Sequence, residues 1–493
     1  LADLAAIPGV TAVVHEQECA TELRRKRKRG LREAPTVRAF INERVCEGCG
    51  DCGRTSNCLS VQPVETEFGR KTQVHQASCN QDYSCFDGDC PSFLAVTPGP
   101  RRPAAPRAPE IDAERIPAPV VRQQSWPIGV RMMGIGGTGI VTTAQVLAVA
   151  ATNAGLHVRG LDQLGLSQKA GAVVSDLRLH RVAFDGSNKL EPAGCDVYLG
   201  ADLLVAADAP NLAVTDPERT LGIVSTTKTP TGTMVADPDA AFPAVAPLRA
   251  LIADRVTAES VFLDARALTE ALFGGDQLAN TVLLGVATQL GAWPIAPALL
   301  EDALVQNGVA VAANIQAFRW GRSYAADPAS VTTLGAPVET GGTPEATVGG
   351  RAGHAAYGLV RDAGLPTDGD LGGLLARRTG DLVAYQDRAY ARRYLRHIAE
   401  VHRRERAALP DRPPVLTETV ARHLHKLMAY KDEYEVARLC LDPALDAQVR
   451  SRFGEDVAYA FRLHPPMLRA LGLGHKVAVP AEPAHEEATE QTP

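Results

Sequence analysis

Seven of the ten cysteines, all between positions 46 and 90, constrain this chain more than any other feature of its sequence. The first three stand at positions i, i+3 and i+6, and the last is followed directly by Pro91. Thiolates at this spacing wrap a loop around one soft metal centre, and a later Cys-Pro supplies the remaining ligand from elsewhere in the chain. The segment therefore predicts an iron–sulfur site and a role in electron transfer. The seven residues are Cys46, Cys49, Cys52, Cys58, Cys79, Cys85 and Cys90.

In the second half of this segment an aspartate stands where a cysteine would be expected, because Cys79-Asn-Gln-Asp82-Tyr-Ser-Cys85 is a Cys-x2-Asp-x2-Cys run. Two-cluster ferredoxins exchange the last ligand between their two runs. By that rule, a first [4Fe–4S] cluster is held by Cys46, Cys49, Cys52 and Cys90, and a second cluster by Cys58, Cys79, Asp82 and Cys85. Carboxylate is a harder ligand than thiolate, so we expect the second cluster to be either Asp-ligated [4Fe–4S] or [3Fe–4S]. The alternative is that Asp82 is a loop residue and only the first cluster forms.

Zinc and disulfides are the rival interpretations of the cysteines. A structural zinc site prefers paired Cys-x2-Cys hooks separated by a longer spacer, which the triple run fits less well. Disulfides need an oxidising compartment. Residues 1–8 show no charged region followed by an apolar core, so no secretory signal is visible. No run approaches the ~18 apolar residues of a membrane span, and we expect a cytoplasmic protein that does not enter a membrane.

Charge and composition exclude some further classes. A length of 493 residues allows roughly three domains, and 45% hydrophobic with 22% charged residues is typical of globular protein. The net charge of -6 argues against general nucleic-acid binding. Arg24–Arg29 is nevertheless a run of six cationic residues. Such a run is usually a solvated surface segment, and the alternatives are contact with an acidic partner such as a ferredoxin or a nucleic-acid patch.

Changes in composition divide the chain into segments. Val10–Val14 reads as a short strand without neighbouring partners, which suggests that the chain continues upstream or packs on another subunit. A proline at every second or third position near residue 100 predicts an extended, structureless linker. The acidic, proline-containing C-terminal end predicts disorder. The expected segments are residues 1–35, an iron–sulfur domain at 36–98, the linker at 99–125, an α/β domain at 126–325, a mostly helical domain at 351–475 and a disordered tail at 476–493.

The α/β domain begins with a strand at Ile128–Met133, a glycine-rich turn and a helix at Ile140–Ala154. A second strand ends at Asp162. Alternation of strands and helices after this point predicts a Rossmann-like, doubly wound domain. The further expected strands are Ala172–Arg178, Val197–Leu199, Leu203–Ala206 and Gly222–Ser225. In the helical domain, apolar spacing predicts one long helix over Leu382–Ala408 and two more at Thr417–Ala429 and Glu433–Leu441.

The glycine-rich turn has the spacing Gly134-x-Gly136-Gly137-x-Gly139. Such a turn lets backbone N–H groups approach a phosphate at the positive end of a helix. Asp162 stands where a dinucleotide fold places the acid that binds a ribose, so an NAD(P) or FAD site is one interpretation. A tight turn needed only for packing is another. The third is a phosphate-bearing ligand that is not a dinucleotide, such as coenzyme A.

Three segments carry a resemblance to one family. Gly134–Thr143 with Leu161–Val174 resembles the gamma domain of 2-oxoacid:ferredoxin oxidoreductases. The cysteine segment, with Pro63–Lys71 and Cys79–Cys85, is similar to the long fused indolepyruvate ferredoxin oxidoreductases. Leu427–Arg438 resembles the C-terminal helical domain of the same fused form. The three segments follow in the same order as in that family.

The resemblance implies an enzyme that oxidatively decarboxylates an aryl 2-oxoacid on thiamine diphosphate. The acyl group passes to coenzyme A, and electrons leave through iron–sulfur clusters to ferredoxin. The gamma domain abuts the active site in this family and is associated with coenzyme A. By position, the residues that would line that site are Gly134, Gly136, Gly137, Thr138, Gly139, Gln168 and Lys169, with Thr229–Gly232 as an additional candidate.

One departure from the family concerns thiamine diphosphate. Its binding domain needs a Gly-Asp-Gly run with a later Asn-Asn pair, and this sequence contains no Gly-Asp-Gly. We therefore expect thiamine diphosphate and Mg²⁺ in a missing or partner domain, of which residues 1–35 resemble the end, and a homo- or hetero-oligomer. Two other functions stay open. The chain is either an iron–sulfur oxidoreductase with flavin or NAD(P) at the glycine loop, or a redox- or nucleotide-sensing binding protein.

Overall fold

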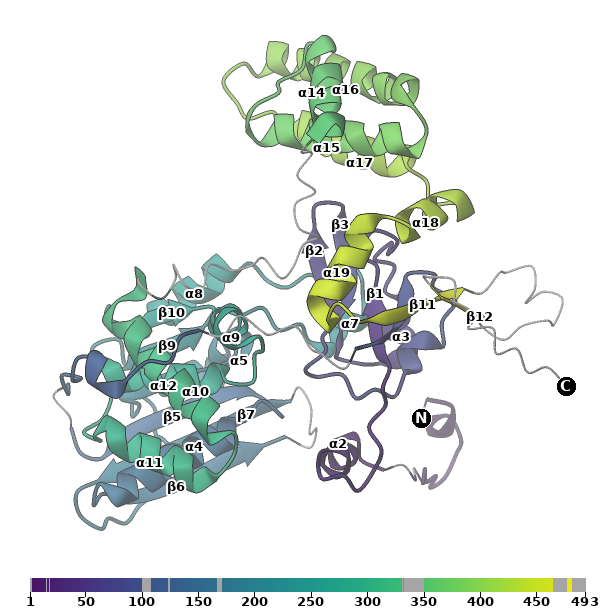
Figure 1. Cartoon of the computed structure of the whole chain (residues 1–493). Coiled ribbons are helices and arrows are strands. Elements are labelled where there is room, and N and C mark those ends of the chain that lie inside the picture. Colours follow the sequence, from purple (N-terminus) through teal and green to yellow (C-terminus); the bar gives the residue numbers. More distant parts are fainter. Residues whose placement is uncertain are drawn as a thin grey trace, which may run out of the picture.

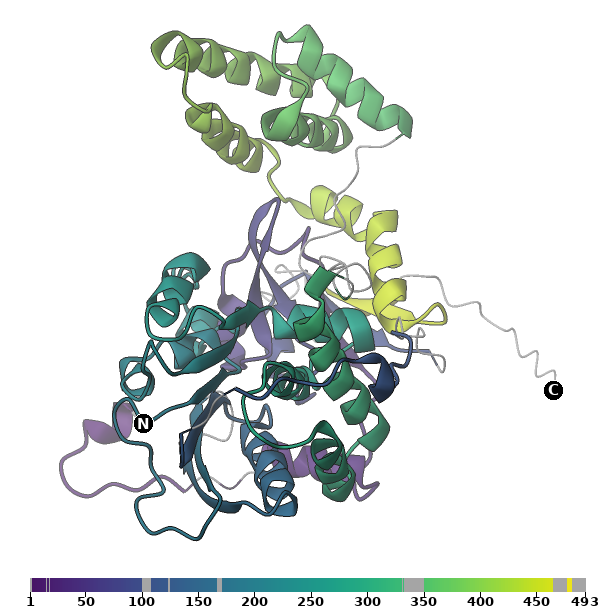
Figure 2. The same ribbon diagram turned by 90° about the vertical axis from the view of Figure 1, so that its left-hand side faces the viewer.

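A computed structural model of the chain describes residues 2–14, 16, 18–99, 108–122, 125–165, 171–329, 331, 350–463 and 477–480. An α/β domain lies on one side of the cysteine-rich segment, and a bundle of C-terminal helices projects from the other side (Figure 1). In the view turned by 90°, the α/β domain lies in front of the cysteine-rich segment, and the helical bundle projects above both (Figure 2). Among the described residues, no helix combines the length and apolar composition that a membrane crossing requires.

The α/β domain is built on a six-stranded sheet in the order β10-β9-β8-β5-β7-β6. Strands β10, β9, β8 and β5 are parallel, whereas β7 is antiparallel to both β5 and β6. The sheet is therefore mixed, and the expected α/β alternation is interrupted where the chain folds back through the β6–β7 hairpin. The strands are β5 (Ile128–Ile135), β6 (His157–Leu164), β7 (Ala172–His180), β8 (Val197–Gly200), β9 (Leu221–Ser225) and β10 (Val261–Leu263).

Side chains alternate between the two faces along each strand, so each face of this sheet carries apolar residues. Helices therefore cover both faces. Met132 and Leu199 point into one core, while their neighbours Met133 and Tyr198 point into the other. The first core is closed by α4 (Ile140–Asn153), α9 (Ala265–Phe273), α10 (Ala279–Gln289), α11 (Pro297–Asn307) and α12 (Val311–Ala326). The second is closed by α5 (Leu203–Ala206), α6 (Ala209–Leu212) and α8 (Val245–Ala253).

One expected strand of this domain is a helix. Leu203–Ala206, which the sequence predicted as a strand, forms α5. The side chain of Asp202 accepts a hydrogen bond from the backbone N–H of Val205 at 2.9 Å. An aspartate in this position caps a helix and satisfies one of its unpaired donors. The apolar run therefore begins a helical turn instead of continuing the sheet.

Residues 108–122, expected to be a structureless linker, form a strap along the α/β domain. Ala108 donates its backbone N–H to Leu272 at 3.1 Å, and Arg122 donates to Gly291 at 3.1 Å. The guanidinium of Arg322 donates to the carbonyl of Pro117 at 3.2 Å. Prolines lack a donor but keep their carbonyl acceptors, so side chains of the domain can hold an extended, proline-rich segment in place.

The cysteine-rich segment contains a hairpin and a small antiparallel sheet that the C-terminal end completes. Strands β2 (Val61–Thr66) and β3 (Gly69–Val74) form the hairpin. The sheet has the order β1-β4-β11-β12, so β11 returns from far along the chain to pair with β4. The remaining elements are β1 (Arg38–Ile41), α3 (Asp51–Ser56), the 3-10 turn η1 (Ser84–Phe86), β4 (Phe93–Thr97), β11 (Ala458–Leu463) and β12 (Val477–Pro480).

These two strands correct the expected C-terminal boundaries. Residues 351–475 are not only helical, because β11 belongs to the sheet of the cysteine-rich segment, and residues 477–480 of the expected tail form β12. The physical reason is that β4 has an open edge whose backbone groups need partners. Phe461 of β11 adds an apolar side chain to the core around Leu94 and Val96.

The C-terminal helices form a bundle followed by a return path. The expected single helix over Leu382–Ala408 is divided, because Asp387 caps a new helix by accepting the N–H of Tyr390 at 2.7 Å. The bundle comprises α14 (Gly350–Asp362), α15 (Gly369–Tyr385), α16 (Arg388–Ala408) and α17 (Val415–Met428). Two further helices, α18 (Glu433–Cys440) and α19 (Pro443–Phe453), lead back to the cysteine-rich segment (Figure 2).

The first 35 residues contain two helices, α1 (Ala2–Ala5) and α2 (Ala20–Lys28). The strand expected at Val10–Val14 is wrong, because these residues are irregular and the side chains of Val10 and Val14 are exposed. No strand in the described part of the chain pairs with them. A strand is held by hydrogen bonds to a neighbouring strand. Without such a partner, this apolar run stays irregular.

Asp381 connects the bundle to the cysteine-rich segment through a buried ionic cluster. Its carboxylate lies 2.7 Å from Arg44, which precedes Cys46 by two residues, and 3.1 Å from Arg438 of α18. His425 of α17 lies 3.0 Å away. Burial alone would raise the pKa of Asp381, but the hydrogen bond to His425 and the charges of Arg44 and Arg438 outweigh it and hold that pKa well below its usual range.

We expect Asp381→Asn to lower the free energy of unfolding by about 3 kcal/mol at pH 7, because it leaves the largely buried Arg44 without a counter-charge, whereas Arg438 keeps Glu435. A depressed carboxyl pKa gives stability that is present above the ordinary value of about 3.9 and is lost as pH falls towards the folded-state pKa. The difference between variant and wild type should therefore shrink below pH 4. Urea unfolding at several pH values measures it. Asp411→Asn, at an exposed position, is the control, and an equal loss in both variants would contradict the role of the cluster.

Candidate functional site

Two loops of the cysteine-rich segment share one backbone conformation. We call residues 46–52 the first loop and residues 79–85 the second loop. In the first loop, Gly48 and Gly50 have positive φ angles of 68° and 75°. In the second loop, Gln81 and Tyr83 stand at the corresponding places and have φ angles of 59° and 61°. Non-glycine residues rarely adopt this region, so the repeated pattern marks two loops wound in the same way.

Both loops also direct a backbone donor at their first sulfur. The N–H of Gly48 donates to Sγ of Cys46 at 3.3 Å, and the N–H of Gln81 donates to Sγ of Cys79 at 3.4 Å. N–H groups aimed at sulfur tune iron–sulfur clusters. In this correspondence, Asp82 occupies the place of Cys49, and both residues are exposed.

The cysteine thiols form two groups. All ten cysteines lie in the described residues, and no disulfide joins any two of them. Burial, followed by repulsion from Cys46, Cys90 and Cys49, raises the pKa of Cys52 to about 12. Burial, followed by repulsion from Cys79, Cys58 and Asp82, raises the pKa of Cys85 to about 12. The structure therefore brings together the same residues that the crossed ligand rule assigned to the first and second clusters.

This donor set fits thiolate-ligated iron. Burial and mutual repulsion both disfavour thiolates in the metal-free protein, and a bound cation reverses this because it stabilises neighbouring anions. A later ligand is also positioned, because Sγ of Cys90 lies 2.9 Å from Oγ of Ser92 in a half-buried site. Where bound, the clusters would supply the one-electron carriers, while the protein fixes their position and potential.

Asp82 has a second role within its own loop. Its Oδ1 accepts hydrogen bonds from the backbone N–H of Ser84 at 3.2 Å and from the Ser84 hydroxyl at 3.0 Å. An aspartate that bonds the backbone two residues on stabilises a turn. Asp82 thus lies at the ligand position of the second loop and also shapes that loop, so both interpretations offered by the sequence have support in the geometry.

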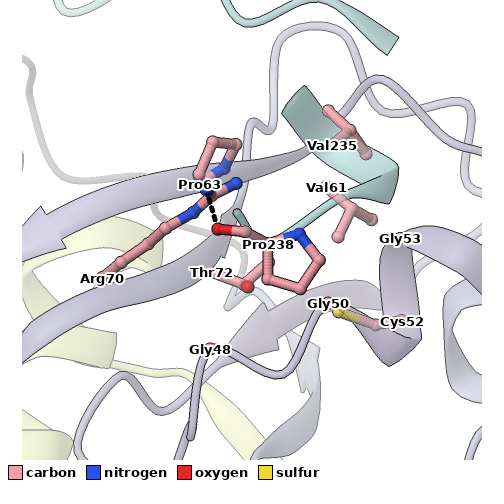
Figure 3. A pocket seen from close by; sticks show the side chains of 10 residues that line it. All are labelled: Gly48, Gly50, Cys52, Gly53, Val61, Pro63, Arg70, Thr72, Val235 and Pro238. Carbon is pink, nitrogen blue, oxygen red and sulfur yellow. Dashed lines mark hydrogen bonds between the residues drawn. The ribbon is translucent and has the colours of Figure 1, made fainter. Parts of the chain in front are cut away.

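Arg70 attaches the first loop to the α/β domain. Its guanidinium donates to the carbonyls of Met234 at 2.6 Å, Ala240 at 3.0 Å and Pro238, all at or just after α7 (Gly232–Ala236). Figure 3 shows the side chain reaching Pro238 beside the glycines of the first loop. A cavity of about 10 Å³, roughly the space of one water molecule, lies at this contact.

Close approach at this contact explains one glycine. A Cβ atom on Gly53 would lie 2.3 Å from the carbonyl oxygen of Val235. No side chain fits at that distance, so only glycine allows α3 to pack against α7. The first loop is therefore pressed against the α/β domain by backbone contact as well as by Arg70.

His75 forms the corresponding attachment near the second loop. Its Nε2 lies 3.2 Å from the carboxylate of Asp276, which also lies 3.2 Å from the guanidinium of Arg266. Burial alone would raise the pKa of Asp276, but His75 and Arg266 hold it below its usual range. Glu270 lies 3.6 Å from Arg266. Because Arg266 already pairs with both carboxylates, we interpret the group as an ionic bridge between segments.

The glycine loop joins β5 to α4. Gly134 is needed for packing, because a Cβ there would lie 2.9 Å from Cδ1 of Ile140. Gly137 and Gly139 have positive φ angles of 86° and 98°, and both are exposed together with Thr138. The open tip of the loop leads into the N-terminus of α4, where unpaired N–H groups and the helix dipole favour an anion.

The glycine loop is linked to the cysteine-rich segment. Gly136 donates its N–H to Gly171 at 2.7 Å, so this group is engaged by the protein itself. The amide of Asn280 donates to the carbonyl of Thr138 at 3.0 Å. Asn280 begins α10 just after Asp276, the partner of His75, so one short segment touches both sites. Gln168 and Lys169 lie outside the described residues.

Two other expected residues have structural partners. Thr231 caps α7 by accepting the N–H of Met234 at 3.4 Å. Asp162 accepts a hydrogen bond from the Ser175 hydroxyl at 2.6 Å. It lies on β6, which is separated from β5 by β7. A dinucleotide fold places its ribose-binding acid on the strand next to the first one, so this sheet order does not favour an NAD(P) site.

Comparison with known families gives a specific result for the α/β domain. Residues 129–324 match the family described as pyruvate ferredoxin/flavodoxin oxidoreductase. This match covers the α/β domain and less than half of the chain, and it agrees with the resemblance that the sequence of this domain carries. Residues 371–489 match a family of unknown function, DUF6537. No curated protein matches the chain.

Several solved structures resemble part of the chain. The pyruvate oxidoreductase subunit PORC of Thermotoga maritima is 18% identical, with 40% of this chain and 96% of that one covered and a TM-score of 0.30. The gamma subunit of a keto/oxoacid ferredoxin oxidoreductase from Geobacter sulfurreducens is 18% identical, with 41% of this chain and 97% of that one covered and a TM-score of 0.30. A third structure is the 2-oxoglutarate:ferredoxin oxidoreductase of Magnetococcus marinus with 2-oxoglutarate, coenzyme A and succinyl-CoA bound. It is 20% identical, with 41% of this chain and 31% of that one covered and a TM-score of 0.30.

We expect Arg70→Met to loosen the attachment of the first loop to α7. Hydrogen bonds from a charged donor contribute about 1.5–3 kcal/mol, so the free energy of unfolding should fall by about 2 kcal/mol. Amide hydrogen exchange in residues 232–240 should become faster. Arg404→Met, at an exposed position on α16, is the control. Unchanged exchange in residues 232–240 would show that Arg70 does not hold this contact.

Proposed function

We propose that this chain is the electron-transfer and gamma-domain component of an indolepyruvate-type ferredoxin oxidoreductase. It would take part in the oxidative decarboxylation of an aryl 2-oxoacid to an acyl-coenzyme A. The main support is that a segment with two groups of cluster-suited ligands is attached, through Arg70 and His75, to a domain that matches a ferredoxin or flavodoxin oxidoreductase family. Clusters bound to these ligands would lie beside the domain that we propose binds coenzyme A.

Coenzyme A is the proposed ligand of the glycine loop. At the exposed tip, the N–H of Thr138 donates to the carbonyl of Ile135 at 3.3 Å, which leaves the backbone of Gly137 and Gly139 and the N-terminus of α4 to face a phosphate. Gly134 and Gly136 hold the loop in place, because Gly134 packs closely against Ile140 and Gly136 donates its N–H to Gly171. We further propose Gln168 and Lys169, which follow β6 in the sequence, as contacts of the ligand.

Thiamine diphosphate with Mg²⁺ is proposed to lie on another domain or subunit, because this sequence lacks the Gly-Asp-Gly run. When bound there, it supplies the carbon chemistry of decarboxylation. The residues described here would bind coenzyme A and carry electrons away. Adding that partner and comparing indolepyruvate with pyruvate as substrates would test the aryl preference. Equal or better turnover of pyruvate would reject it.

Ferredoxin is the proposed electron acceptor. Arg27 of α2 donates to the carbonyl of Asn80 in the second loop at 2.8 Å, and Arg24 donates to the carbonyl of Ala77. The exposed side chains of Arg25 and Arg29 therefore lie close to the second loop. Clustered positive charge attracts an acidic protein and accelerates its association, which suits an acidic electron carrier.

The crossed ligand assignment predicts different losses for two single variants. We expect about eight iron atoms per anaerobically purified chain if the second cluster is [4Fe–4S], and about seven if it is [3Fe–4S]. Cys90→Ala should lose the first cluster and keep the second, while Cys58→Ala should lose the second and keep the first. Cys19→Ala, which removes a cysteine outside both groups, should keep both. Iron analysis with EPR measures these losses. About four iron atoms in the wild-type chain would leave only one cluster.

Coenzyme A binding can be tested at two glycines of the same helix. Gly139 and Gly155 lie at opposite ends of α4 and have positive φ angles of 98° and 76°. Alanine at either position costs backbone strain of a similar kind. We expect Gly139→Ala to weaken coenzyme A binding at least tenfold in calorimetry, and Gly155→Ala to leave it unchanged. Tight binding of NADH and none of coenzyme A would instead favour the dinucleotide interpretation.

A further inference from the structure

The return path of the C-terminal helices ends on the first loop. Lys431, between α17 and α18, donates from Nζ to the carbonyls of Cys46 at 3.1 Å and Val45 at 3.2 Å. Its ammonium also lies 2.6 Å from the carboxylate of Glu47. Lys431 belongs to the stretch that matches the family of unknown function. A side chain of that stretch therefore touches the backbone of a proposed ligand of the first cluster.

A second lysine shares the same acceptor. Lys71 of β3 is buried and donates from Nζ to the carbonyl of Cys46 at 2.7 Å. The ammonium groups of Lys71 and Lys431 thus donate to the same carbonyl oxygen. Like charges at such a separation repel. The carboxylate of Glu47 lies nearby but is about half exposed, so solvent screens its attraction for the ammonium groups. The arrangement suits a further negative group at Cys46.

A thiolate-ligated cluster is such a group. A [4Fe–4S] core with four thiolates carries net negative charge, and reduction adds one more negative charge. A fixed ammonium beside it stabilises the reduced form more than the oxidised form. This step rests on the proposed function, because it requires that the first cluster forms on Cys46 and its partners.

Lys431 is held in position by its neighbours. The next residue, Asp432, caps α18 by accepting the N–H of Glu435 at 2.8 Å. At the other end of α18, the carbonyl of Leu439 accepts a hydrogen bond from Asn42, just before the first loop, at 3.2 Å. Lys431 directly precedes a helix that is anchored at both ends, so its charge stays at a fixed place. The charge of a lysine on a free surface would instead be averaged by motion and screened.

We propose that the C-terminal region sets the reduction potential of the first cluster by fixing the charge of Lys431 against the backbone of Cys46. Lys431 is on this view a positioning residue for electron transfer and does not touch substrate. The region of unknown function would then have a defined task, which is to make the first cluster easier to reduce. Its contact with Arg44 through Asp381 holds the same part of the chain.

The test is a redox titration of the full, anaerobically purified chain monitored by EPR. We expect Lys431→Met to leave about tenfold less reduced first cluster at a given ambient potential, which for one electron is a fall of about 59 mV. Lys431→Arg should behave as wild type. Lys426→Met, which removes an exposed lysine of α17, should not shift the potential. The second cluster serves as an internal reference.

Lys431→Gln separates charge from hydrogen bonding, because glutamine retains amide donors for the two carbonyls. It should lower the potential as Lys431→Met does, and it provides the readout if the methionine variant loses iron. A first cluster that is present in both the wild type and Lys431→Gln, with equal potentials, would overturn the proposal. A wild-type chain that holds no iron would instead reject the proposed function, so the two failures are distinguishable.

Discussion

The guanidinium of Arg70 is the interaction on which the spatial arrangement of this protein most depends. It spans the boundary between the hairpin of the cysteine-rich segment and the end of α7 in the α/β domain. The proposed electron transfer needs fixed distances, and a proline-rich linker alone would not provide them. Together with the ionic bridge of His75 and Asp276, it makes two folding units act as one support for both loops. The glycine loop gains its position relative to the cysteines in this way.

The return of the C-terminal end has an equally large effect on the architecture. Strand β11 completes the sheet that begins at β1, and α19 packs Phe453 against Phe40. One of the two apolar cores of the cysteine-rich segment therefore depends on residues far along the chain, while the other is built from the segment itself. The first loop is supported on one side by the α/β domain and on the other by residues far along the chain. The contacts of Asp381 and Lys431 belong to the same support.

Local pattern was sufficient for some elements and insufficient for others. The β5 strand, the glycine turn and α4 follow from spacing within a short window, and so does the grouping of cysteines into two runs. The helix at Leu203–Ala206 was missed because a single capping aspartate outweighs an apolar run. Arg70 and His75 carry no local signal, because their partners lie more than 160 residues away. The same reason hides β11, whose role depends on the open edge of β4.

The pairing of β4 with β11 also has a consequence for biogenesis. β4 begins three residues after Cys90, and its partner strand is synthesised several hundred residues later. At ordinary translation rates this interval is roughly tens of seconds. During this time the cysteines would already have left the ribosome while their sheet lacked an edge and their first loop lacked Lys431. Lasting insertion of the proposed clusters would then wait until Lys431 and β11 have been synthesised.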